Sequence, residues 1–488
     1  MNNIALSQQE FWRYLFSPGS VAVIGASNTP GSWGNNAMKG VLDAGNKRVY
    51  PVNPNSLEIL GKKAYRSIRE IPDEIDLAVI VVPEKLVPDV MRQCAGKGVK
   101  SAIIITSGFA ETGEAGRKLE AEVADIARQG GIRFIGPNSM GHADTFTQMS
   151  TFGQTGEMKK GPVAVLSQSG STCMKIVRCL TDLGVNCSKY VSTGNEASLT
   201  LEDYMEFLAQ DDDTKLIAAY VEGLRDGRRF FRLAKEITKK KPVAVVKVGG
   251  TEESARAVMS HTGALAGSDA VHAAAFRQSG VIRAEDDDEL CDVVYALVNS
   301  PLPRNNRIGI LTIGGGQGAL TAEICEREGL AVGKLEPATV ERLDKILPAR
   351  WPRRNPVDMA GPTAADLAQI SNLLMPLLED KNLDIILLLV PIIVDNTVLT
   401  GRMGLKPEQI QAYREQEQKN IVMIRGKIEE YEKPVAGIWQ GRGVNSDASS
   451  LVKLRDGKIL AFGNTRRTAR VISHLFRYRQ YLDAARGE

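Results

Sequence analysis

The chain reads Val21-Ala22-Val23-Ile24-Gly25-Ala26-Ser27 near its start, and this stretch indicates the fold. Four apolar residues in succession predict a strand that is buried on both faces. The small residues after them predict a tight turn, and the following segment is compatible with a helix. A strand that runs through such a turn into a helix is typical of the start of an open parallel sheet. In such sheets the ligand crevice lies at the carboxyl ends of the strands.

The same pattern occurs twice more. An apolar run ends in a turn of small residues at 163–171, which reads VAVLSQSGS, and again at 308–316, which reads IGILTIGGG. Further apolar runs follow each start at the spacing of strand–helix–strand units, which predicts α/β domains with right-handed crossovers. These expected strands are 49–52, 77–82, 102–105, 132–135, 216–221, 243–246, 385–390 and 435–438.

Polar and Gly-rich stretches at 145–161 and 299–306 interrupt the pattern and predict linkers. We therefore expect three domains, at 12–145, 160–300 and 304–486, which suits 488 residues at about 100–200 residues per domain. A helix at roughly 466–486 is expected to pack on the third domain.

The composition excludes several classes of protein. Lysine and arginine number 61 against 58 acidic residues, so the net charge of +3 gives no reason to expect a nucleic-acid or membrane partner. The first residues lack the pattern of a signal peptide, and the longest apolar run, 385–394, is too short to span a bilayer. Six cysteines without a C-x-x-C pair fit a reducing compartment, so we expect a cytoplasmic protein without a metal site of its own.

The first turn, Gly25 to Gly34, favours a phosphate-bearing nucleotide, because small residues let phosphate approach the backbone amides at a helix start. An ordinary strand-to-helix turn explains it equally well. The tight G-x-G-x-x-G spacing is absent, and Pro51-Val52-Asn53-Pro54 stands where a nicotinamide enzyme carries an acidic residue. A nicotinamide-dependent oxidoreductase is therefore disfavoured.

The second turn combines three serines and a glycine in Ser167-Gln168-Ser169-Gly170-Ser171, directly before an expected helix. Free amides, hydroxyls and the positive end of the helix dipole favour an anion there. A helix cap alone would need fewer such residues. We therefore predict that Ser169, Gly170 and Ser171 bind phosphate.

Of the four histidines, His142, His272 and His474 are expected to be ordinary surface, pocket-lining or core residues. His261 differs because it lies in Ser260-His261-Thr262-Gly263-Ala264-Leu265-Ala266-Gly267, which predicts a loop of small residues. A neutral imidazole accepts a phosphoryl group near pH 7. A carboxylate on the far ring nitrogen would steady the cation, and Glu222, at the end of an expected strand, is the candidate.

These residues carry a resemblance to a known family. The stretch 260–267, SHTGALAG, is very similar to the phosphohistidine loop of the ADP-forming acetyl-CoA synthetase branch of the succinyl-CoA synthetase superfamily. The stretches 192–195, 274–282 and 355–358 continue the match. The resemblance implies an N-terminal Rossmann-like CoA-binding domain followed by two flavodoxin-like ligase domains.

The resemblance also implies the roles of individual residues. His261 would carry the phosphoryl group and Glu222 would orient it. Coenzyme A would be bound along the first domain, near the thioester end at Asn138. The residues that would hold its nucleotide and line the path of its pantetheine arm are Gly25, Ala26, Ser27, Asn53, Pro54, Val82, Pro83, Ser107, Gly108 and Phe109.

The family also needs an ATP-grasp module for ATP or ADP and Mg²⁺, for which the three domains leave no room, and no P-loop replaces it. The resemblance therefore implies a hetero-oligomer with an ATP-grasp partner of the beta type. The expected reaction interconverts acyl-CoA, phosphate and ADP with a small carboxylic acid, CoA and ATP. Acetate, branched, aryl and dicarboxylic acids are all compatible with it. The alternative is a CoA-binding regulatory protein without turnover.

Overall fold

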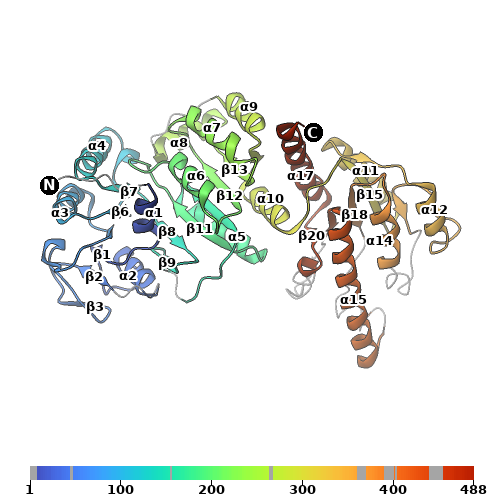
Figure 1. The fold of residues 1–488 in the computed structure, drawn as a ribbon, viewed down its shortest axis with the longest axis horizontal. Helices are drawn as coiled ribbons and strands as arrows, with labels where there is room; N and C mark the ends of the chain where they lie inside the picture. Colours follow the sequence, from blue (N-terminus) through green and yellow to red (C-terminus); the bar gives the residue numbers. More distant parts are fainter. Residues whose placement is uncertain are drawn as a thin grey trace. The chain divides into compact units, whose positions relative to one another are not determined.

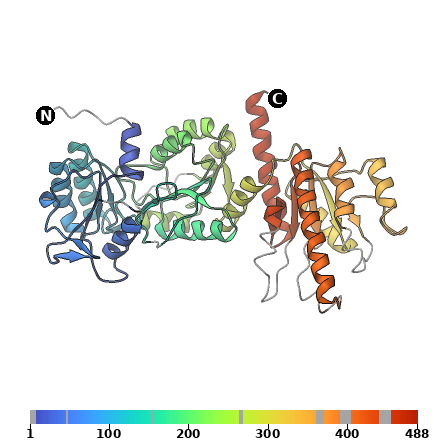
Figure 2. The same ribbon diagram turned by 60° about the horizontal axis from the view of Figure 1, so that its bottom comes forward.

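The structure, a computed structural model, describes residues 8–43, 45, 48–153, 156–262, 268–359, 370–389, 401, 404–438 and 454–487. It divides into two compact units, 1–291 and 292–488, and Figures 1 and 2 show the elements of each. The first unit contains one parallel sheet and one mostly parallel sheet, and the second unit contains one parallel sheet. The predicted mixed α/β class is thus confirmed.

The first sheet has five parallel strands in the order β2-β1-β5-β6-β7. Alternate strand residues face opposite sides, as the pleat requires. One face packs on α3 and α4 through Ala22, Ile80 and Ile104, and the other packs on α1 and α2 through Val21 and Ile103. The elements are α1 (Gln8–Phe16), β1 (Val21–Ile24), α2 (Trp33–Asp43), β2 (Val49–Val52), β5 (Leu77–Ile80), α3 (Val87–Lys97), β6 (Ser101–Ile104), α4 (Glu114–Gln129) and β7 (Arg133–Ile135), with a small hairpin, β3 (Glu58–Ile59) and β4 (Lys62–Lys63), and the short helices η1 (Ile68–Glu70), η2 (Glu84–Leu86) and η3 (Ala110–Thr112).

The second sheet has seven strands in the order β14-β13-β12-β10-β11-β8-β9, and its first five strands are parallel. Strands β8 and β9 are antiparallel. The elements are β8 (Gly141–Asp144), β9 (Met149–Ser150), β10 (Val163–Ser167), α5 (Gly170–Asp182), β11 (Cys187–Ser192), α6 (Leu201–Gln210), β12 (Leu216–Val221), α7 (Gly227–Ile237), β13 (Val243–Lys247), α8 (Glu252–Thr262), α9 (Asp269–Ser279) and β14 (Ile282–Ala284); α10 (Asp287–Asn299) follows.

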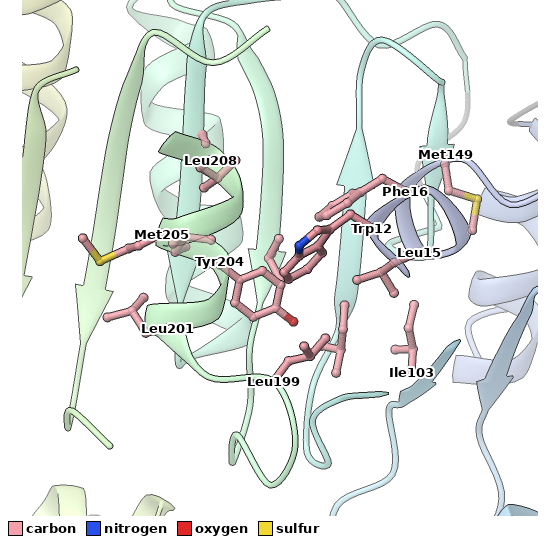
Figure 3. Packing of buried hydrophobic residues seen from close by; sticks show 14 of the residues in the cluster. Trp12, Leu15, Phe16, Ile103, Met149, Leu199, Leu201, Tyr204, Met205 and Leu208 are labelled. Atoms are coloured by element: carbon pink, nitrogen blue, oxygen red, sulfur yellow. The ribbon is translucent and has the colours of Figure 1, made fainter. Parts of the chain in front are cut away.

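One hydrophobic cluster joins the two sheets of the first unit (Figure 3). Trp12 of α1 stacks on Phe207 of α6 with ring centroids 4.6 Å apart, and Phe16 stacks on the same ring at 5.1 Å. The Arg133 guanidinium lies 5.8 Å from the Trp12 ring centroid and adds a cation–π contact. The N-terminal helix therefore packs against both sheets and makes them one body.

The second unit holds a six-stranded parallel sheet in the order β16-β15-β18-β19-β20, with β17 beside β15. Leucine-rich α14 and the end of α15 cover it and form its core. The elements are β15 (Arg307–Thr312), α11 (Gly315–Arg327), β16 (Ala331–Val332), α12 (Pro337–Asp344), β17 (Val357–Asp358), α14 (Ile370–Glu379), β18 (Ile385–Leu389), α15 (Pro407–Tyr431), β19 (Val435–Ile438), β20 (Ile459–Phe462) and α17 (Thr465–Arg486).

Each expected strand is present within a residue or two in the described part of the chain, and the expected C-terminal helix is α17. One expectation was wrong in detail. The stretch 145–161 was expected to be a linker, but it contains β9, and β8 just before it pairs with β11 of the second sheet. Their short polar sequences lack an apolar run, so the pattern of buried strands missed them. The domain limits 12–145, 160–300 and 304–486 stay predictions.

No helix in the described ranges is both long enough and apolar enough to cross a bilayer. Five of the six cysteines are buried.

We predict that Trp12→Ala lowers the free energy of unfolding of the first unit by about 3–5 kcal/mol, because it leaves a cavity between the two sheets. Chemical denaturation followed by circular dichroism measures the change. Arg13→Ala, at an exposed position of the same helix, is the control and should change stability by less than about 0.5 kcal/mol. Equal stability of the two variants would show that the cluster does not hold the sheets together.

Candidate active site

The carboxyl edge of the first sheet brings together the predicted nucleotide-binding turns. Gly25 has φ +91°, and a Cβ there would lie 2.3 Å from the Val81 carbonyl oxygen, so only glycine fits. Asn53 at the end of β2 donates its side-chain amide to the Ala26 carbonyl at 2.9 Å. Ala26 is fully buried and can present only its backbone to a ligand. Gly25, Ala26, Ser27 and the Asn53-Pro54 turn thus form one backbone surface at the edge.

The ends of β5 and β6 continue this surface. The Thr106 hydroxyl donates to the Val82 carbonyl at 2.7 Å and joins the two strand ends. Glu111 of η3 accepts the amides of Gly108 at 2.6 Å and Phe109 at 3.1 Å. Ser107 and Pro83 are exposed, whereas the Phe109 ring is wholly buried in the core. The predicted lining by Phe109 is therefore possible only through its backbone.

The serine-rich turn lies at the carboxyl end of β10 and starts helix α5. Ser169 is the N-cap residue, and its hydroxyl accepts the Thr172 amide. A Cβ on Gly170 would lie 2.6 Å from the Met140 side chain, so the turn is packed closely against the residues before β8. The amides of the first helical turn have no acceptor within the helix. The predicted phosphate-binding residues Ser169, Gly170 and Ser171 thus present these amides and the half of the helix dipole that attracts anions.

Glu222 follows β12, the strand beside β10, so its turn lies next to the serine-rich turn at the same edge. The residue is buried. Its backbone amide donates to Gln168 Oε1 at 2.5 Å, and its carbonyl accepts from Lys247 Nζ at 2.9 Å. Burial lowers the pKa of Lys247, with smaller contributions from neighbouring charges. The Glu222 backbone is therefore held on both sides by buried side chains.

His261 was expected in a loop, but its backbone belongs to the last turn of α8. Helix α8 (Glu252–Thr262) thus includes Ser260, His261 and Thr262, the first three residues of the expected loop. The His261 side chain and residues 263–267 lie outside the described residues. Helix α8 lies beside η3, the short helix that carries Glu111 and follows β6 at the carboxyl edge of the first sheet. The predicted pairing of His261 with Glu222 stays a prediction.

The loop after β11, residues 193–197, connects the two edges, and sequence reasoning missed its importance. Asn195 is buried and donates its side-chain amide to Glu111 at 2.7 Å and to Glu120 at 2.8 Å, both on the first domain. Its backbone amide donates to the Pro137 carbonyl at 2.9 Å. Asn138, predicted near the thioester, contacts Asn195 Oδ1 at 3.3 Å. The resemblance at 192–195 was the available signal.

Glu196 is a second residue that the sequence did not single out. It is buried, has φ +56°, and accepts the Thr193 hydroxyl at 2.8 Å. Burial raises its pKa to about 7, although Gln168 and Thr193, which favour the carboxylate, oppose this. A non-glycine residue in this backbone region is uncommon and costs about 1–3 kcal/mol. A buried acid that titrates near neutrality at a strand end indicates a functional site.

A groove of about 1060 Å³ begins directly after the Glu222 turn. Arg225, Arg228 and Arg232 line it on one side, and half-buried His272 lines it on α9. Burial lowers the pKa of His272, and nearby Lys247 adds to this effect.

His142, by contrast, is wholly buried where α1 packs on β8. Its Nε2 lies 2.8 Å from the Leu15 carbonyl oxygen, which accepts the hydrogen bond.

Comparisons with known proteins agree with this geometry. A CoA-binding domain model matches residues 19–144, and a succinyl-CoA ligase-like flavodoxin domain model matches residues 160–297. The alpha subunit of an ADP-forming acetate–CoA ligase of Pyrococcus furiosus is 44% identical over 77% of this chain and 81% of the relative. The chain belongs to the ADP-forming acyl-CoA synthetase family.

A second sequence relative and a solved structure are also similar to this chain. An ADP-forming acetate–CoA ligase of Archaeoglobus fulgidus is 42% identical over 76% of this chain. The match covers 54% of that relative, so this chain spans about half of its length. A dinucleotide-forming acetyl-coenzyme A synthetase of Candidatus Korarchaeum cryptofilum, solved with phosphate and ADP, superposes with a TM-score of 0.81, at 30% identity, over 97% of this chain and 98% of that one. The predicted family and fold are confirmed. Gly25 to Asn138 lie within the CoA-binding model, and Ser169, Glu222 and His261 lie within the ligase model.

We predict that Glu196→Gln stabilises the family member at pH 8 and not at pH 5. An acid whose folded pKa is about 7, against 4.5 for an unperturbed group, favours the folded state below pH 4.5 and loses that contribution as the pH rises through 7. The difference between the folded and unfolded pKa corresponds to about 3 kcal/mol of unfolding free energy, which the parent loses at pH 8 and the variant does not. Thermal unfolding of both proteins across this range measures it.

The control is Glu236→Gln, because Glu236 is exposed and forms only a surface ion pair with Lys239. Its effect on stability should be nearly the same at pH 5 and at pH 8. A stability difference between Glu196→Gln and the parent that stays constant from pH 5 to pH 8 would contradict the assignment.

Proposed function

We propose that this chain is the CoA-binding, phosphohistidine-carrying component of an NDP-forming acyl-CoA synthetase. It interconverts acyl-CoA, phosphate and ADP with a carboxylic acid, CoA and ATP. The observation that carries the proposal is the junction at Asn195, which joins the edge of the CoA-binding domain to the edge that holds Ser169 and Glu222. A CoA-binding domain alone would not need a serine-capped helix at that junction.

In the direction of acyl-CoA breakdown, phosphate bound at the amides of Gly170 and Ser171 attacks the thioester carbonyl carbon. A C–O bond forms, the C–S bond breaks, and CoA leaves as its thiolate. The neutral His261 imidazole then attacks phosphorus, so an N–P bond forms and the P–O bond to the acyl group breaks, which releases the carboxylate. The phosphoryl group finally passes from His261 to ADP on an ATP-grasp partner, where Mg²⁺ would be held.

The residues of this chain stabilise charge at each displacement. The first turn of α5 offers amides to the phosphate oxygens in a fixed position, which stabilises charge without reorganisation in the transition state. The Glu222 carboxylate accepts the far ring N–H of His261 and stabilises the imidazolium that forms. Phosphoryl transfer depends mainly on such positioning and electrostatic stabilisation.

We predict that the chain incubated with acetyl-CoA and ³²P-phosphate acquires an acid-labile, base-stable label, and that His261→Asn abolishes it. Asparagine keeps the approximate size of the side chain and removes the ring nucleophile. The label is measured on the denatured protein after quenching in alkali. His272→Asn is the control, because His272 lines the neighbouring groove and is the alternative acceptor.

Retention of the label in His261→Asn and its loss in His272→Asn would overturn the assignment of the carrier. CoA binding without any label, with all acyl-CoA substrates of the panel, would instead support the regulatory alternative. Addition of a purified ATP-grasp subunit and ADP to the labelled chain should release labelled ATP, which tests the partner. A panel of acetyl, branched, aryl and dicarboxylic acyl-CoA substrates identifies the acyl group.

We predict that Asn53→Ala weakens CoA binding about tenfold, because its side chain holds the Gly25–Ser27 turn through Ala26. A lost hydrogen bond of about 1.4 kcal/mol corresponds to this factor. Isothermal titration calorimetry with CoA measures it. Asn306→Ala in the second unit removes a comparable bond to the Gly329 carbonyl and should leave CoA affinity unchanged. Equal affinities of both variants would contradict the role of the Asn53 turn.

A further inference from the structure

We propose that Gln168 is the positioning residue that fixes the Glu222 turn to the phosphate-binding turn, so that the two act as one unit in phosphoryl transfer. The proposal rests on the proposed function and assigns a role to a residue that forms no part of it. Gln168 lies in the serine-rich turn, between Ser167 and Ser169, and is nearly buried.

The side-chain amide of Gln168 bonds the Glu222 turn three times. Oε1 accepts the Glu222 amide at 2.5 Å and the Gly223 amide at 2.9 Å. Nε2 donates to the Gly223 carbonyl at 2.8 Å. The backbone amide of Gln168 also donates to the Tyr220 carbonyl at 3.2 Å. Buried amides are satisfied in this way because each unpaired group costs about 1–3 kcal/mol.

These bonds begin where the sheet ends. The pairing of β10 with β12 stops at Ser167 and Tyr220. The Gln168 amide adds one further main-chain bond to the Tyr220 carbonyl, and beyond it the Gln168 side chain bonds the Glu222 and Gly223 backbone. The turn that carries Ser169 and Gly170 is therefore tied to the turn that carries Glu222 through this side chain.

The bonds of Gln168 are part of a buried row that crosses four neighbouring strands, in the order β13-β12-β10-β11. Lys247 on β13 donates to the Glu222 carbonyl, and Gln168 accepts the Glu222 amide. On the other side, Gln168 lies against Glu196, which is bonded to Thr193 after β11. Every member of the row lies at the carboxyl edge, where ligands bind in parallel sheets.

The position of the Glu222 backbone decides where its carboxylate can reach. If a positioning residue is lost, the catalytic group is still present but samples geometries that do not react, and a displacement of about 1 Å can cost about 100-fold in rate. Phosphate affinity and CoA affinity depend on other atoms of the chain. The loss should therefore appear in the rate of phosphoenzyme formation and not in binding.

The test compares Gln168→Met with Gln148→Met. Gln148 is a matched control, because its Oε1 accepts the Met158 amide at 2.8 Å and its Nε2 donates to the Met158 carbonyl at 2.9 Å. The Gln148 Nε2 also donates to the Thr145 carbonyl, so each variant removes three side-chain bonds to backbone groups. The rate of ³²P labelling from acetyl-CoA and phosphate, the KM for phosphate and the Kd for CoA are measured for both.

We expect Gln168→Met to lower the labelling rate about 100-fold, with the KM for phosphate and the Kd for CoA changed less than about threefold. Gln148→Met should label at nearly the parent rate. A parent rate in Gln168→Met, or an equal loss in both variants, overturns the proposal while the label on the parent chain still supports the proposed function. Absence of label on the parent chain overturns the proposed function itself.

Gln168→Glu decides the matter should Gln168→Met fail to fold. A protonated carboxyl group can donate one hydrogen bond and accept others, which are the roles that the Gln168 amide fills toward the Glu222 turn, whereas the carboxylate can only accept. The labelling rate relative to the parent should therefore rise at least about tenfold from pH 8 to pH 5.5. The neighbouring charged groups are Glu196, Glu222 and Lys247, and division by the parent rate at each pH accounts for their titration in the unchanged site. A ratio independent of pH overturns the proposal.

Discussion

The bonds of Asn195 are the constraint on which the arrangement of the site depends. A single buried side chain donates to Glu111 and to Glu120, while its backbone bonds Pro137, and its carbonyl accepts the Arg225 side chain. Glu111, Glu120 and Pro137 belong to the first sheet or to the helices that connect its strands. Arg225 follows β12 of the second sheet. Because Asn195 bonds residues that follow strands of both sheets, the edge predicted to bind CoA and the edge that holds Glu222 are joined at one place.

The close approach at this junction requires a small residue beside the asparagine. A Cβ on Gly194 would lie 2.2 Å from the Pro137 carbonyl oxygen, so a side chain there would push the two edges apart. The apolar cluster around Trp12 and Phe207 supplies the rigidity that the polar junction lacks. Apolar packing fixes the two sheets as one body, and the hydrogen bonds of Asn195 then determine which loops meet.

Much of the fold could be predicted from the sequence, because buried parallel strands are continuous apolar runs. Val21–Ile24 and Val163–Ser167 are such runs, and each ends in a turn whose small residues have a visible physical reason. Strands β8 and β9 could not be found this way, since their sequences are short and lack an apolar run, and β8 joins the sheet only through its pairing with the distant β11. The helical backbone at His261 was missed because a glycine-rich stretch follows it directly.

The candidate site was predictable to the extent that its residues have recognisable chemistry. Serines at a helix start and a histidine near glycines are such signals. Gln168, Asn195 and Glu196 gave none, because an amide or a carboxyl acquires its role only from the backbone groups that tertiary folding places beside it. The pKa of Glu196 shows this dependence, since burial is the main cause that raises it to about 7.

The same burial explains why these polar groups indicate function. Burial also raises the pKa of Glu120 and lowers that of Lys247, so three ionisable groups near the edges are held where water would stabilise them better. Apolar residues of similar size would stabilise the fold more. Glu120, Glu196 and Lys247 lie at or beside the carboxyl edges, whereas other buried ionisable groups, such as Asp144 and Lys189, form an ion pair elsewhere in the second sheet. Charge held in position at the carboxyl edge is what the proposed phosphoryl transfer would require.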